Sequence, residues 1–362
     1  MPDMDSSRPT PNHGNSPGPH HGYDPNQPRV PSGHGDGGQW TKTGSGSPAI
    51  ARREAVVDHS KQESWGSYVD SYGPDGTLAE QRVFNRDGSR IVSEFKPPND
   101  PGNWDERHTV VLPDGTKFTF ENSDNVQRIY DGEGNLVSAT EWTEDGPRPL
   151  PVGQLASPAL AVPLVMALSE AELAAVSAAA VTLFSWLSRG KDPNRTAVFA
   201  FKASKYEKRE TGGKPELVWV GYVKRDELND VCKKLEKVQE YTDSAVKEIL
   251  DDGESKGPAA FGSRVHKLIA DTIEGLNNKD FRAEISRIKS KVADAEYGTK
   301  GSIRMDALEN RAKISTVCVY DPKTGKLGLS FPRTHELAEA AFEKFKYRPN
   351  YIIVIEVRPG QR

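Results

Sequence analysis

The stretch ISTVCVYDPKTG, residues 314–325, decides how the C-terminal third of this chain is expected to fold. Its first seven residues are mostly β-branched or aromatic, which is typical of a buried strand. The strand is expected to end at Asp321, and Lys323 follows two residues later. Side chains of an extended chain return to the same side every second residue, so the two charged groups should project together. The stretch therefore predicts a strand that presents a carboxylate and an ammonium group at its end.

Further elements are expected on both sides of this strand. The spacing of apolar residues predicts a helix, two strands, a second helix and a last strand. Their expected ranges are 263–276, 281–288, 301–308, 334–345 and 351–357. With the strand at 314–320, the order over residues 258–362 is helix, strand, strand, strand, helix, strand, which predicts an α/β/α-like layered domain.

Two carboxylates are expected to meet in this domain. Asp306 lies in the strand before 314–320, so its side chain should lie beside Asp321 and converge with it on one cation. Hard oxygen ligands suit magnesium, with manganese as an alternative. Such a cation stabilises charge on a scissile phosphate and lowers the pKa of an attacking water. The ammonium group of Lys323 would orient that water and stabilise the developing negative charge.

The sequence GSIRMD at 301–306, followed by DPKTG at 321–325, resembles the PD-(D/E)xK superfamily of restriction-endonuclease-like nucleases. The resemblance covers residues 258–362. It implies that Asp306 and Asp321 bind the metal and that Lys323 is catalytic. It also implies DNA as the substrate, with RNA left open.

Two further residues extend the resemblance. The sequence GSRVH at 262–266 is similar to the glycine-and-histidine helix motif of RecB-like members, which implies that His266 is an additional metal ligand. Glu284 resembles an acidic residue near the metal and is a further catalytic candidate. A partner-bonded helix histidine and a solvated strand residue are the respective alternatives. The chain departs from the RecB-like pattern because the helix after Lys323 has no clear Gln-x-x-x-Tyr, and because Pro322 occupies the variable position.

Charge is unevenly distributed along the chain. Residues 258–362 hold 19 Lys and Arg against 13 Asp and Glu, a net charge of +6, whereas the remainder carries −10 of the overall −4. A basic module on an acidic carrier favours a polyanionic partner, although surface lysines are a common alternative cause. Four side chains are predicted to contact nucleic-acid phosphates, with exposed salt-bridge partners as the alternative. They are Arg304, Arg333, Lys344 and Lys346.

The N-terminal half predicts a leader and a hairpin region. Residues 1–50 are rich in Pro, Gly, Ser, His and Asn and are expected to be disordered. Residues 60–145 are expected to form β-hairpins, because Asp-Gly or Glu-Gly pairs recur between alternating β-formers. These pairs end at Gly76, Gly88, Gly115 and Gly134. The hairpins resemble degenerate repeats found in polymorphic toxins, and a short element at 28–41 resembles one near the start of many secreted or toxin-like proteins.

The middle of the chain predicts an apolar helical segment and a spacer. Neither half of 155–188 reaches the roughly twenty apolar residues that a spanning helix needs, so packing against neighbouring domains is favoured over membrane insertion. Residues 195–252 are expected to form an α+β spacer, a hairpin followed by one helix over 226–250. The only two cysteines, Cys232 and Cys318, are expected to be buried thiols.

The sequence as a whole predicts a multidomain α+β chain with a C-terminal nuclease domain at 258–362. The resemblance to polymorphic toxins implies export by a specialised secretion system without a Sec signal, action in the cytoplasm of a target cell and a cognate immunity protein. Two alternatives remain open at this point. One is a housekeeping DNA-repair or restriction-type nuclease, and the other is a non-catalytic module that binds nucleic acid or protein.

Overall fold

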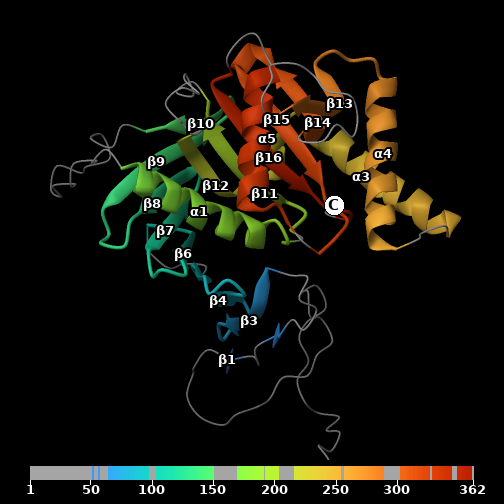
Figure 1. The fold of residues 1–362 in the computed structure, drawn as a ribbon. Helices are drawn as coiled ribbons and strands as arrows, with labels where there is room; N and C mark the ends of the chain where they lie inside the picture. Colours follow the sequence, from blue (N-terminus) through green and yellow to red (C-terminus); the bar gives the residue numbers. More distant parts are fainter. Residues whose placement is uncertain are drawn as a thin grey trace, which may run out of the picture. The chain divides into compact units, whose positions relative to one another are not determined.

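The fold is mixed α+β, as the sequence predicts, and residues 50–362 form one compact unit. The computed structural model describes two sheets and five α-helices (Figure 1). The described residues are 51–52, 56–57, 64–97, 103–150, 169–190, 192–203, 216–253, 257–288, 302–326, 328–344 and 349–360. The leader expected at 1–50 lies outside them.

The first sheet is an antiparallel meander in which each strand pairs with the next from β3 to β10. Its strands are β1 (Ala51–Arg52), β2 (Val56–Val57), β3 (Trp65–Tyr72), β4 (Leu78–Asn85), β5 (Arg90–Phe95), β6 (Glu106–Val111), β7 (Lys117–Ser123), β8 (Val126–Tyr130), β9 (Leu136–Thr143) and β10 (Gly146–Pro149). The four glycines of the predicted turns have φ between +80° and +92°. Glycine adopts this conformation without the steric cost of a Cβ, so the predicted hairpin turns are confirmed.

The second sheet has the order β12-β11-β16-β15-β14-β13. Only the β15–β16 pair is parallel. The strands are β11 (Arg195–Lys202), β12 (Glu216–Lys224), β13 (Phe281–Ile288), β14 (Ser302–Arg311), β15 (Thr316–Pro322) and β16 (Tyr351–Val357). The helices that follow these strands or precede them are α2 (Arg225–Val231), α3 (Leu235–Asp252), α4 (Pro258–Gly275) and α5 (Phe331–Lys344), with a short 3-10 helix η3 (Ala312–Ile314).

The six elements expected over residues 258–362 occur in the predicted order, as α4, β13, β14, β15, α5 and β16. The expected spacer at 195–252 is not separate from them, because β11 pairs with β16 in the same sheet. Strand β16 is mostly apolar and buried along nearly its whole length, and it pairs with β11 on one edge and with β15 on the other. The expected boundary near 258 therefore does not coincide with a break in the sheet.

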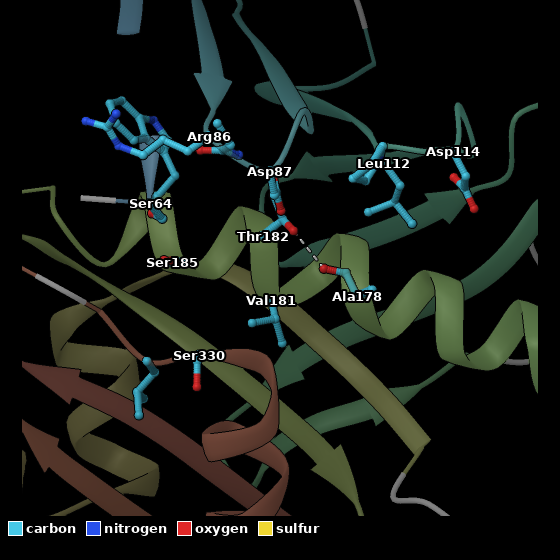
Figure 2. Close-up of a pocket in the computed structure, with 14 residues that line it drawn as sticks. Ser64, Arg86, Asp87, Leu112, Asp114, Ala178, Val181, Thr182, Ser185 and Ser330 are labelled. Carbon is cyan, nitrogen blue, oxygen red and sulfur yellow. Dashed lines mark hydrogen bonds between the residues drawn. The ribbon is translucent and has the colours of Figure 1, made fainter. Parts of the chain in front are cut away.

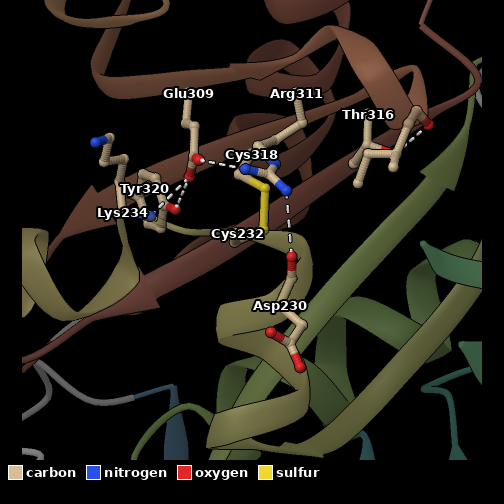
Figure 3. Close-up of a disulfide and its surroundings, with 9 residues drawn as sticks. Asp230, Cys232, Lys234, Glu309, Arg311, Thr316, Cys318 and Tyr320 are labelled. Atoms are coloured by element: carbon tan, nitrogen blue, oxygen red, sulfur yellow. Dashed lines mark hydrogen bonds and ion pairs between the residues drawn. A yellow bond between two sulfur atoms is a disulfide. The ribbon is translucent and has the colours of Figure 1, made fainter. Parts of the chain in front are cut away.

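The single helix expected over 226–250 is two helices, α2 and α3. The chain turns at Cys232, which bonds to Cys318 of β15 as a disulfide (Figure 3). The backbone N–H of Lys234 donates to Glu309 Oε2 at 2.9 Å, which fixes the start of α3. The expectation of two free buried thiols is therefore wrong. The cysteines are 86 residues apart, and their pairing depends on the fold of the sheet.

Helix α1 (Glu170–Leu187) lies within the larger hydrophobic core. It begins at a capping box formed by Ser169 and Glu172 and contacts strands of both sheets as well as α5. This agrees with the expectation of a helix that packs on its neighbours. Residues 155–168 lie outside the described part of the chain. Among the described residues, none of the helices has the length and apolar character that a membrane span requires.

A buried polar network connects the two sheets. Glu106 of β6 accepts hydrogen bonds from Asn122 Nδ2 at 2.9 Å and from Arg195 Nη1 of β11 at 3.1 Å. His108 Nε2 lies 3.8 Å from the same carboxylate. Burial alone would raise the pKa of Glu106, but the charges and hydrogen bonds of these three partners outweigh it and lower the pKa to about 2.

Gln127 of β8 completes this connection. Its side chain accepts from Val220 N at 2.9 Å and also donates to the carbonyl oxygen of the same residue in β12. The amide thus satisfies both backbone groups of one residue on an edge strand of the second sheet. Because the hydrophobic core also contains residues from both sheets, the hairpin region is an integral part of residues 50–362.

Candidate active site

Asp306 and Asp321 lie on neighbouring strands at the same level of the second sheet. Ala307 of β14 pairs with Tyr320 of β15, and the two aspartates are the adjacent residues of each antiparallel strand. Asp321 has no exposed surface, and Asp306 is 5% exposed. The sequence expectation that the two carboxylates lie together therefore agrees with the register of the strands.

Two cations face the Asp321 carboxylate. Lys323 forms an ion pair with it, and Arg333 of α5 places Nη2 3.8 Å from Asp321 Oδ1. The backbone N–H of Lys323 donates to the carbonyl oxygen of Val357 at 2.8 Å, so β16 holds the turn that carries the lysine. Pro322 is compatible with this arrangement because the neighbouring residue makes the backbone bond.

The pKa of Asp321 is raised above the ordinary value of an aspartate. Burial raises its pKa to about 6, and the nearby charge of Asp306 adds to this effect. Lys323 and Arg333 act in the opposite direction without cancelling it. A buried carboxylate that shares its surroundings with a second one would be stabilised by a further positive charge.

Helix α4 approaches the site from its N-terminal half. His266 Nδ1 lies 3.1 Å from Asp306 Oδ1. One turn earlier, a Cβ at Gly262 would lie 3.3 Å from Thr324 Oγ1, so the glycine permits close contact between α4 and the turn after Asp321. His266 thus lies beside the Asp306 carboxylate, and its role as a metal ligand stays a prediction.

For most of the other predicted site residues, the structure does not describe the side chain. Glu284 of β13 lies between Ala283 and Ile285, whose partners in β14 flank Asp306, but its side chain lies outside the described set. The same applies to the side chain of Arg304, and Lys346 is not described at all. Lys344, in the last turn of α5, contributes to lowering the pKa of Glu274, which places it near α4.

The metal prediction can be tested against the side chains that are described. Among them, no group of three or more His, Cys, Asp and Glu is arranged to hold a metal ion. Asp306, Asp321 and His266 supply donors of the expected chemistry, and burial raises the pKa of Asp321 despite the nearby Lys323 and Arg333. The carboxylate oxygens are donors of the kind that a hard divalent cation prefers. The side chain of Glu284, a further candidate near the metal, is not among those described.

Sequence reasoning missed one acidic residue of this region. Glu356 of β16 pairs in register with Asp321 and is 2% exposed. It accepts hydrogen bonds from Leu329 N at 2.7 Å, Arg358 Nε at 2.6 Å and Ser188 Oγ at 3.2 Å. The available signal was a lone glutamate near the end of an otherwise apolar strand, because such a residue is expected to need partners when buried.

A groove of about 670 Å³ lies beside the residues that precede α5 (Figure 2). Loops of the first sheet and one face of α1 form most of its wall, and Leu329 and Ser330 form the rest. None of the residues predicted to be catalytic lines it. The candidate site is therefore defined by its buried charges and not by this groove.

No protein-family model, curated protein or solved structure matches this chain.

Proposed function

We propose that residues 195–362 form a restriction-endonuclease-like nuclease that hydrolyses nucleic-acid phosphodiester bonds with a divalent metal ion. The observation that carries the proposal is the pairing of Asp306 with the buried Asp321, whose pKa is raised to about 6, beside the ammonium group of Lys323. Two carboxylates on neighbouring strands can hold such an ion, and a nearby lysine can stabilise developing negative charge. The element order of residues 258–362 supports the same assignment.

Asp306 and Asp321 would hold magnesium, with manganese as the alternative, and His266 would be an additional ligand. When bound, the ion would lower the pKa of a water molecule and stabilise charge on the phosphate. Lys323 would orient that water and offset charge that develops on the phosphate oxygens. Arg333 lies close enough to Asp321 for its guanidinium group to form an ion pair with a phosphate bound beside this carboxylate.

DNA is the substrate that the sequence resemblance implies, and RNA is the alternative. The context that we propose is an interbacterial toxin, exported by a specialised system, active in the cytoplasm of the target cell and neutralised by an immunity protein. Support for this context comes from the resemblance of residues 60–145 and of the N-terminal element to those of toxins. Neighbouring genes discriminate it from a housekeeping nuclease, because an adjacent immunity gene favours the toxin.

The test is cleavage of plasmid DNA and of RNA by the full-length protein with magnesium or manganese. The full chain is required because the core joins both sheets. We expect Asp306→Ala and Lys323→Ala each to lower the cleavage rate by about 10³-fold or more. Asp271→Ala is the matched control, because Asp271 is an exposed aspartate on α4 and its removal should leave the rate unchanged.

A non-catalytic binding module is the second candidate, and it is favoured by the contacts of Asp321 with Lys323 and Arg333, which partner the carboxylate within the protein itself. It predicts that the wild-type protein binds nucleic acid without magnesium and that Asp306→Ala binds equally well. Absence of cleavage by the wild type on both substrates and with both metals would overturn the nuclease proposal and favour this module.

A further inference from the structure

Glu356 differs from the other acidic groups near the site because its charge is fully surrounded by donors. The strand YIIVIEV at 351–357 is otherwise aromatic or aliphatic, and burying a carboxylate in it costs free energy unless hydrogen bonds replace water. Here the replacement comes from three separate segments. Ser188 follows α1, Leu329 precedes α5, and Arg358 follows β16.

These contacts hold both ends of the connection between Lys323 and α5. At the first end, Arg358 Nε donates to Glu356 while its Nη1 donates to the carbonyl oxygen of Gly325 at 2.9 Å. At the other end, the N–H of Leu329 donates directly to Glu356. A Cβ at Gly328 would lie 3.2 Å from Glu356 Oε2, so a larger residue there would require the carboxylate to shift.

The two fixed ends adjoin two side chains of the candidate site. Lys323 lies two residues before Gly325, and Arg333 lies four residues after Leu329, in the first turn of α5. Both side chains face Asp321, which pairs in register with Glu356 on the parallel neighbouring strand. One buried carboxylate therefore restrains, through backbone contacts, the segments that carry both cations.

We infer that Glu356 is a positioning residue that sets the placement of Lys323 and Arg333 for phosphodiester cleavage. The inference rests on the proposed nuclease function. Glu356 has no role in binding the metal, because its two oxygens are already engaged by Leu329, Arg358 and Ser188. Its effect on the reaction passes through the connection from residue 323 to residue 333.

Glu309 provides a matched control on the same sheet. It is also a buried carboxylate, 3% exposed, and it accepts hydrogen bonds from Tyr320 Oη at 2.6 Å and from Lys234 N at 2.9 Å (Figure 3). Those partners belong to β15 and to the start of α3. Tyr320 lies three residues before Lys323, but it contacts Glu309 through its phenol hydroxyl and not through its backbone. Removing its charge tests what the loss of any buried carboxylate does to this sheet.

The experiment compares Glu356→Gln with Glu309→Gln in the full-length protein. Steady-state cleavage gives kcat and KM, and hydrogen exchange gives the protection of the amides at 323–326, 328–331 and 333. We expect Glu356→Gln to lower kcat by about tenfold or more with KM changed less than about twofold, because misplaced catalytic groups slow the chemical step. Exchange should become faster in these segments only. Glu309→Gln should leave kcat and these amides unchanged.

Unchanged kcat and unchanged exchange in folded Glu356→Gln would overturn the inference while the nuclease function stands. If the wild type does not cleave nucleic acid, the proposed function fails, and the exchange data then decide whether Glu356 positions the two segments. If Glu356→Gln does not fold, Arg358→Gln replaces it, because that change removes the link to Gly325 and leaves the carboxylate in place. Wild-type kcat and exchange in Arg358→Gln would likewise overturn the inference.

Discussion

The network around Glu106 and the cluster around Asp321 both bury a carboxylate, with opposite results. At Glu106, one arginine, one histidine and one amide outweigh burial, and the pKa falls to about 2. At Asp321, burial and Asp306 prevail over Lys323 and Arg333, and the pKa rises to about 6. The first group is fully compensated by the protein itself. At the second, burial outweighs the two nearby cations.

This difference separates a structural use of buried charge from the use proposed for the site. A compensated carboxylate joins two sheets and has no need of a ligand, because its hydrogen bonds are complete. An under-compensated pair costs folding free energy in the free protein and regains it when a cation binds. A buried carboxylate whose pKa is raised beside a second carboxylate is therefore a candidate for a functional site.

The largest expected effect on the free energy of unfolding comes from a substitution of Glu106. Because the pKa of Glu106 is depressed below its ordinary value of 4.5, its contribution is present above pH 4.5 and is lost as the pH falls toward 2. Glu106→Gln should lower the free energy of unfolding at pH 7 by about 3 kcal/mol. It should also flatten the decline in stability between pH 4.5 and 2.

Urea unfolding over this pH range measures both effects. Glu121→Gln is the control, because this glutamate pairs with Arg107 in the first sheet alone and does not link the two sheets. A loss of stability at pH 7 that is no larger for Glu106→Gln than for Glu121→Gln would remove the contrast between the two regions.

A smaller effect of opposite sign is expected at Asp321. Its folded pKa is raised from 3.8 to about 6, so the free protein should lose stability as the pH rises through this interval. Asp321→Asn removes that cost and should raise the free energy of unfolding at pH 8, without metal, by about 1–2 kcal/mol. Magnesium should then raise the Tm of the wild type and leave the Tm of the variant unchanged.

Thermal unfolding at pH 8 with chelator and with magnesium tests this prediction, with Asp271→Asn as the exposed control. Destabilisation of Asp321→Asn in chelator would mean that Lys323 and Arg333 compensate the carboxylate fully. An equal response of wild type and variant to magnesium would mean that the ion binds elsewhere.

The features that the sequence predicts are those that depend on residues close together in the chain. The Asp-Gly turns follow from the conformational freedom of glycine, and the placement of Lys323 beside Asp321 follows from the two-residue repeat of a strand. Asp306 required one further assumption, that consecutive strands are neighbours in the sheet, and β14 and β15 satisfy it.

The other parts depend on pairings that the sequence does not specify. Glu356 becomes relevant only because β15 and β16 are parallel and in a particular register. The bond between Cys232 and Cys318 requires the turn between α2 and α3 to lie against β15, and the Glu106 network requires the two sheets to meet. Each of these contacts joins segments far apart in the chain, where periodicity and composition carry no information.

The smallest expected effect tests how closely α4 must approach the site. Gly262→Ala gains up to about 1 kcal/mol of helix propensity, but its Cβ would lie 3.3 Å from Thr324 Oγ1. Gly275→Ala, at the other end of α4, makes the same change with no atom within 4 Å of the new Cβ. Thermal unfolding should therefore show a smaller gain for Gly262→Ala than for Gly275→Ala, and only the former should cleave nucleic acid severalfold more slowly. Equal stability and equal cleavage in the two variants would mean that the contact between α4 and Thr324 does not constrain the Asp321 cluster.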